Sequence, residues 1–383
     1  MAELRKWAAS ALLLAAAVAA AVFAPSAGSE QGVGGSNTRR MVCRARVLAV
    51  DDSGLQTLGH VQYGSQTLEV ELLDGDRKGM RARAGNTVRG QMELDTIYRP
   101  GDVLLASAPS AELSENATPV LTALSPWRLA PTLAVFALFA LLLVAFAGRT
   151  GLNALTSFVF CAFVVWRVVV PLALAGWNAS LVAFVATGVM AAAIMALVGG
   201  FTRKAAVAFG GCMLGVAAGL CLAHLFGSML GINGATLPFV QTLVYSGAAD
   251  LDLADLFLAA TILAGSGAMM DLAMDIAAGA REVARHSPLI SRRELFMSAV
   301  RIGRATVGTM TTTLLLAYSG GYLSLLMVFA AEGVPPHVFL NSPIVAAEVA
   351  KTLVGSFAVV LVAPFTAFLA AAAFAHRNRH IAG

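Results

Sequence analysis

The sequence has little charge. Asp, Glu, Lys and Arg make up 13% of its 383 residues, and 58% of the residues are hydrophobic. Soluble domains have about 25% charged and roughly 45–50% apolar residues. The mean hydropathy is correspondingly high, at +0.77. This composition predicts a polytopic membrane protein.

Nucleotide-binding and hydrolase signatures are also missing. The sequence contains no GxxxxGK(S/T), HExxH, GxSxG or GxGD motif, so we expect neither an enzyme nor any catalytic residue. A membrane-embedded hydrolase is the third-ranked alternative, and any pumping would use an ion gradient or a partner ATPase. The four cysteines show no metal spacing, and we expect no disulfide framework, metal site or cofactor.

The chain begins with the features of an export signal. Arg5 and Lys6 precede an apolar run over residues 8–23, and small residues follow it. Residues 1–27 are therefore either a cleaved signal peptide or a retained signal anchor. Both alternatives export the segment that follows.

Residues 28–126 are polar and carry strand signals between glycine-containing turns. The predicted strands are 41–50, 67–73, 79–84 and 102–106. They predict a small exported β-barrel-like domain of the OB type. Its basic residues suit an anionic ligand, a lipid surface or merely solvated strand faces. No aromatic stacking platform accompanies them, so we expect no nucleic-acid partner.

Residues 127–376 contain apolar runs, each near the roughly 20 residues that a bilayer requires. The predicted spans are 129–147, 152–175, 180–199, 205–228, 256–278, 305–329 and 344–374. With the first segment they make eight. The predicted fold is an all-α polytopic membrane bundle of about seven to eight transmembrane helices, with the exported β domain before it and a cytoplasmic tail at 377–383.

The basic residues support one orientation. The loops 176–179, 229–252 and 331–342 contain no Lys or Arg, whereas the alternate loops are basic. By the positive-inside rule, both termini are cytoplasmic if the first segment is uncleaved, and residues 28–126 are extracytoplasmic. The net charge of +4 therefore reflects membrane flanks.

Two aspartates interrupt the span at 256–278. Asp271 lies about 4–5 residues, or roughly 7 Å, below the predicted midplane, and Asp275 approaches the inner interface. The two share a helical face with Gly267 and Gly279, where small residues allow a neighbouring helix to approach closely. An aspartate within a membrane is costly, so function is the default interpretation for Asp271, and a structural pair with an arginine is the alternative.

The next span returns through a run of threonines: Thr309, Thr311, Thr312 and Thr313. Their depth matches that of Asp271, so we expect hydroxyl-to-carboxylate contacts. The alternative is that each hydroxyl bonds a carbonyl of its own helix. The segment before this span predicts an amphipathic surface helix, with Ser291 as its N-cap and Glu294 completing a capping box.

A second polar layer lies in the outer half. Arg167 follows a tryptophan in the span at 152–175. Glu348 and Lys351 are three residues apart on one face of the span at 344–374. We expect an ion pair between Arg167 and Glu348, in either a functional or a structural role. The two layers together would line a path for an ion or substrate.

Three segments carry a resemblance to a known family: GSGAMMDLAMDIAAGAREV, RRELFMSAVRIGRATVGTMTTTLLLAYSGG and NSPIVAAEVAKTLVGSFAVVLVAPFTAF. They resemble the YibE/F family of multipass bacterial membrane proteins, over about residues 129–374. The resemblance implies a plasma-membrane protein of the permease kind. It marks Asp271, Thr311 to Thr313, Glu348 and Lys351 as motif positions and transfers no catalytic residue.

A weaker similarity concerns mechanism. An intramembrane aspartate is followed by a basic amphipathic helix and a threonine-rich span. This order is similar to that in resistance-nodulation-division transporters and Sec export accessory proteins, where an aspartate relays protons. This chain differs in its small exported domain and in the position of the aspartate. The inference is one of analogy.

Two functions follow as hypotheses. The first is a transporter or permease, proton- or cation-coupled through Asp271, with a small ion or solute as substrate and the lipid bilayer as surroundings. The alternative is a membrane scaffold or accessory factor that does not transport, whose exported domain binds a protein partner.

Overall fold

A computed structural model describes residues 40–74, 77–92, 94–109, 120–248 and 250–375. The predicted signal segment at 1–27 and the tail at 377–383 lie outside these residues. The chain divides into two compact units, with the boundary between Leu142 and Leu143.

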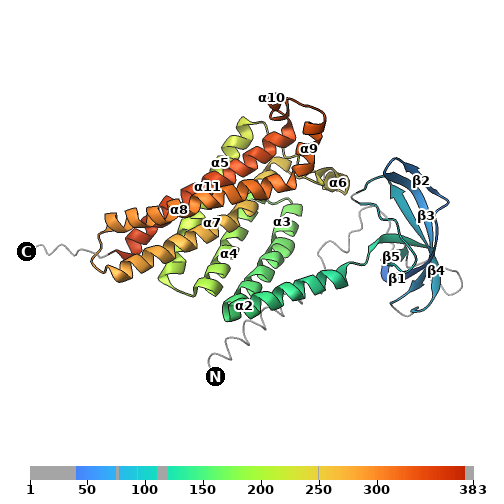
Figure 1. Cartoon of the computed structure of the whole chain (residues 1–383), viewed down its shortest axis with the longest axis horizontal. Coiled ribbons are helices and arrows are strands. Elements are labelled where there is room, and N and C mark those ends of the chain that lie inside the picture. The colour runs from blue at the N-terminus through green and yellow to red at the C-terminus, as the bar shows by residue number, and fades with distance from the viewer. Residues whose placement is uncertain (1–39, 75–76, 93, 110–119, 249, 376–383) are drawn as a thin grey trace, which may run out of the picture. The chain divides into compact units, whose positions relative to one another are not determined.

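Strands build the first unit (Figure 1). They are β1 (Arg40–Asp51), β2 (Leu55–Leu58), β3 (Val61–Leu72), β4 (Arg81–Arg89), β5 (Val103–Pro109) and β6 (Val120–Pro126). The order is β1-β5-β6-β4-β3-β2, and β1 also pairs with β3. Five strands therefore close into a barrel, and β2 extends β3 as a hairpin. The closed barrel confirms the predicted β-barrel-like domain, and it adds β2 and β6 to the predicted strands.

Strict alternation along β4 shows how the sequence makes this barrel. Arg81, Arg83 and Arg89 point outward, whereas Ala82 and Ala84 are buried. Because side chains of a strand alternate between its two faces, the arginines stay in solvent while small residues face the core. The structure thus places these three arginines on a solvated strand face.

A buried polar network crosses the barrel. Gln66 is fully buried, and its amide nitrogen donates to Asp52 at 2.6 Å. Its amide oxygen accepts from the Asn86 side chain at 2.9 Å and from the Tyr98 backbone at 3.0 Å. The network satisfies polar groups that would otherwise be costly to bury, and it ties β3 and β4 to the loop before β5.

Helices follow from residue 129 (Figure 1). They are α2 (Leu129–Val164), the π-helix η1 (Val165–Val169), α3 (Val170–Leu174), α4 (Ala179–Gly199), α5 (Arg203–Met229), α6 (Val240–Tyr245), α7 (Leu253–His286), α8 (Arg292–Gly321), α9 (Leu323–Ala331), α10 (Pro336–Phe339) and α11 (Pro343–Phe374). Gly148 breaks α2 with φ 55° and ψ −125°, a conformation that glycine adopts readily.

Five helical segments of the described chain are long and apolar enough to cross a membrane, or six if the bent pair α8–α9 is one span. That count treats residues 129–174 as one segment. The predicted seven to eight spans are therefore not confirmed, although the mostly helical membrane class is. The observed ends of α4, α5 and α11 lie within two residues of the predicted ends.

The span predicted at 305–329 needs correction. Helix α8 begins at Arg292 and includes the amphipathic segment, because neither proline nor a turn separates that segment from the threonine run. The predicted capping box of Ser291 and Glu294 is present at its start. The helix ends with two weak helix formers, Gly320 and Gly321. Helix α9 then continues at an angle of 65° to α8.

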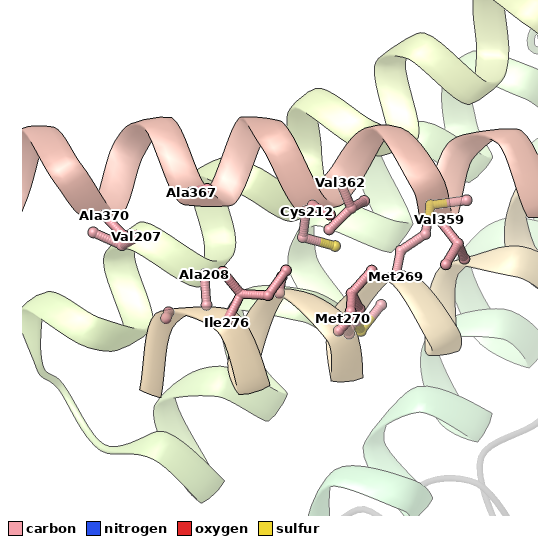
Figure 2. Close-up of a cluster of buried hydrophobic side chains, with 14 of the residues drawn as sticks. Val207, Ala208, Cys212, Met269, Met270, Ile276, Val359, Val362, Ala367 and Ala370 are labelled. Atoms are coloured by element: carbon pink, nitrogen blue, oxygen red, sulfur yellow. The ribbon is translucent and has the colours of Figure 1, made fainter. Parts of the chain in front are cut away.

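Helices α5, α7 and α11 pack together around the main core (Figure 2). Cys212, Ile276 and Val362 are among its fully buried side chains. Glycines of α5 allow the close approach of α11, because a Cβ at Gly215 would collide with Val362. Close approach at small residues is typical of helix pairs in membranes.

Candidate functional site

Helix α11 brings a carboxylate and an ammonium group together inside the helical unit. Lys351 Nζ donates to Glu348 Oε1 at 2.6 Å, and the two side chains are only 11% and 13% exposed. Their spacing of three residues places them on one face of the helix. Lys351 also lies 5.9 Å from the ring centre of the buried Phe257 of α7.

Tyr322 joins this pair from the break between α8 and α9. Its hydroxyl donates to Glu348 Oε1 at 2.5 Å, and the residue is both the C-cap of α8 and the N-cap of α9. The Glu348 carboxylate therefore holds the point at which the chain bends. Its other oxygen, Oε2, is buried and has no hydrogen-bond partner among the residues described.

A cavity of about 170 Å³ opens beside these groups. Its walls come from α8, α9 and α11, and they are mostly apolar: Leu315, Tyr318, Ser319, Tyr322, Leu325, Leu326, Val345, Glu348, Val349, Thr352 and Leu353. The Tyr318 hydroxyl is buried and likewise lacks a partner within the described part of the chain. The cavity thus offers an acceptor and a hydroxyl inside an apolar wall.

Asp271 and Asp275 form a separate polar group on α7. Asp271 lies near the middle of this 34-residue helix and is about 14 residues, or roughly 21 Å of helix, from Phe257 at the ion pair. Both aspartates are exposed on one stripe. Of the glycines expected to meet a neighbouring helix there, Gly279 contacts Ile302 of α8, but a Cβ added at Gly267 would meet no atom within 4 Å.

Both polar groups lie within a region that matches a known family. Residues 135–376 match the YibE/F-like protein family, which is more than half of the chain. The chain belongs to the YibE/F-like family. No curated protein and no solved structure matches it. The resemblance stated from the sequence is thus confirmed, and membership together with the apolar helices makes this a membrane protein.

The threonines of this YibE/F-like protein bond within their own helix. The hydroxyls donate to backbone carbonyls of α8, Thr309 to Thr306, Thr311 to Val307 and Gly308, Thr312 to Gly308, and Thr313 to Thr309. The expected contact with Asp271 is absent from the hydrogen bonds described. The structure instead shows the alternative stated from the sequence, in which each threonine hydroxyl donates to a carbonyl of its own helix.

Arg167 lies on the π-helix η1, which packs on α4. Glu348 takes its hydrogen bonds from Tyr322 and Lys351, so the pair of Arg167 with Glu348 stays a prediction. A short π segment is often found at functional positions.

Sequence reasoning missed the two tyrosines. In the sequence, Tyr318 and Tyr322 look like ordinary residues of an unbroken span. The signal that could have found them is the Gly320–Gly321 pair directly before Tyr322, since two glycines weaken a helix at the point where it bends.

Proposed function

We propose that this YibE/F-like protein is a proton-coupled transporter in which Glu348 accepts the coupling proton. The observation that supports it is the buried Glu348–Lys351 pair, hydrogen-bonded to Tyr322 where α8 ends and α9 begins. Charged groups inside a membrane cost about 2.5–3.5 kcal/mol each on insertion scales, so a sequence that keeps them at a broken helix has a use for them.

Protonation of Glu348 would couple charge to shape. The ionised carboxylate attracts Lys351 and holds the Tyr322 hydroxyl, which fixes the bend. A proton on the free oxygen, Oε2, removes the charge of the carboxylate and weakens both contacts. The bend between α8 and α9 is then less restrained, and a broken helix beside a binding cavity is a recurrent arrangement in secondary transporters.

Asp271 would serve as the second carboxylate of the path. Asp275 continues it toward the inner surface, while Thr309 and Thr311 to Thr313 line the neighbouring helix. Arg167 belongs with Glu348 and Lys351 to the outer gate. A small ion or solute is the proposed substrate, and the lipid bilayer is the surrounding partner.

The proposed location is the plasma membrane of a bacterium. The OB-type barrel is exported and lies on the extracytoplasmic side of this membrane. The termini are cytoplasmic if the first segment is retained. We assign the barrel no enzymatic role.

The rival function is a scaffold whose exported barrel binds a protein partner. The barrel supports this alternative because it lies, with the start of α2, in a compact unit separate from the rest of the helices. Deleting residues 28–126 distinguishes the two functions, since a scaffold loses its activity with the barrel and a transporter keeps proton flux through the helical unit.

Proton flux in proteoliposomes tests the proposal. Under an imposed pH gradient, with the membrane potential clamped, vesicles with the wild type should lose the gradient faster than empty vesicles. Glu348→Gln should fall to the rate of empty vesicles, because the amide cannot take up the proton. Glu332→Gln is the matched control, since Glu332 is exposed after α9. A wild-type rate equal to that of empty vesicles, or an undiminished rate in Glu348→Gln, contradicts proton coupling at Glu348.

A further inference from the structure

The exposed faces of the membrane helices are of two kinds. On α4 the exposed residues include Leu181, Val185 and Val189, at 57%, 56% and 49%. On α11 they include Phe357 and Phe368, at 47% and 65%. Large apolar side chains of this kind suit contact with lipid.

Helix α7 has a different exposed face. Its stripe consists of Ala264, Gly267, Asp271 and Asp275, and the exposed large hydrophobic residues of the described chain include none from α7. Neither aspartate makes a hydrogen bond or an ion pair in the described part of the structure. Two unpaired carboxylates and small residues make a poor lipid-facing surface for a membrane span.

Helix α8 continues this face beside α7 (Figure 1). Arg304, Gly308, Thr309 and Thr312 are exposed, and no atom lies within 4 Å of a Cβ placed on Gly308. Arg304 also makes no ion pair with any described residue. The face therefore carries charges of both signs, and neither sign is neutralised by a partner among the residues that the structure describes.

The contacts between α7 and α8 establish the relative depth of these groups. Gly303 of α8 lies against Ile276 of α7, where a Cβ added at Gly303 would be 3.0 Å from Ile276 Cδ1. Because the helices run in opposite directions, Arg304 lies at the level of Asp275. Four residues further along each helix, about 6 Å, Gly308 and Thr309 lie at the level of Asp271.

We propose that two copies of the chain associate through the α7–α8 face, defined by Gly267, Asp271, Asp275, Arg304, Gly308 and Thr312. A two-fold axis along the membrane normal keeps every residue at its own depth. Asp275 then faces Arg304 of the partner subunit. Asp271 lies at the same depth as the partner's Gly308. The glycines allow the helices to approach closely. Asp275 and Arg304 are complementary to each other in charge across the two-fold axis, which favours a second copy over an unrelated protein.

Reversal of charge tests the pairing. Asp275→Arg and Arg304→Asp, each alone, should abolish the wild-type dimer measured by native mass spectrometry from lipid nanodiscs. Each homodimer then opposes like charges at both pairs. When the two variants carry different tags and are expressed together, the mixed dimer restores one pair of opposite charges on each side of the axis and should be recovered. Arg203→Asp, an exposed charge at the start of α5, is the control and should leave the dimer intact.

Gly308→Leu keeps the test decisive if a charge variant fails to fold. A Cβ at this position meets nothing in its own subunit, so the monomer should fold normally while the dimer is lost. A wild type that is monomeric in nanodiscs contradicts the proposal, as does a dimer that survives both single reversals and Gly308→Leu. Recovery of a different protein on this face, without a second copy, also contradicts it. These results do not depend on transport, so they are separable from the flux experiment.

Discussion

At the scale of single residues, glycine determines how close two helices can lie. Gly219 of α5 would place a Cβ 2.9 Å from the Cβ of Ala358 on α11. Gly215 would place one against Val362, which is fully buried. Packing of this density leaves no room for an added side chain.

Gly215→Val should therefore destabilise the helical unit. Overpacking in a close-packed core costs about 1–3 kcal/mol, so we expect a lower melting temperature in detergent. Gly320→Ala is the control, because no atom lies within 4 Å of its added Cβ. Equal melting temperatures for the wild type and Gly215→Val would show that α5 and α11 do not pack as described.

Other single residues mark where sequence reasoning succeeds and where it ends. The sequence places Glu348 and Lys351 on one face of a helix, because three residues along a helix return to the same face. It does not pair them, since the ion-pair partner predicted for Glu348 is Arg167. The bond from Tyr322 to Glu348 joins residues 26 apart, and the bonds of Gln66 join three separate segments. Such contacts depend on tertiary packing, which local patterns do not encode.

At the scale of elements, the break between α8 and α9 matters most. Tyr322 lies at this break, and its hydroxyl donates to Glu348. Among the residues that the structure describes, no other side chain at the break makes this bond. None of the residues of α9 is buried, so packing alone restrains this helix weakly.

Tyr322→Phe should loosen α9 while leaving the ring in place. A hydrogen bond to a charged group contributes about 1.5–3 kcal/mol, so amide hydrogen exchange across residues 323–331 should rise by at least about tenfold. Tyr245→Phe is the matched control, since Tyr245 is 86% exposed at the end of α6. Unchanged exchange in Tyr322→Phe would mean that Glu348 does not restrain the bend.

The elements themselves are largely predictable from the sequence. Apolar runs of about 20 residues or more place α4, α5 and α11, because a helix of that length crosses a bilayer with its backbone polar groups paired internally. The short strands β2 and β6 escape prediction because each has little alternation of its own and is held by its neighbours. The bend after Gly321 escapes it because the apolar pattern runs on through the break.

At the scale of the whole molecule, the proposed proton path depends on carboxylates at two depths. Glu348 lies in a buried cluster, and Asp271 lies on the proposed interface about 21 Å of helix further along. If protons cross the membrane by way of both, neutralising either one should stop the flux.

The most direct measurement is the proton flux of Asp271→Asn beside that of Glu348→Gln and the wild type, at equal protein content and verified folding. We predict that both variants fall to the rate of empty vesicles, whereas the wild type dissipates the gradient. A flux in Asp271→Asn equal to that of the wild type would contradict a proton path through both carboxylates.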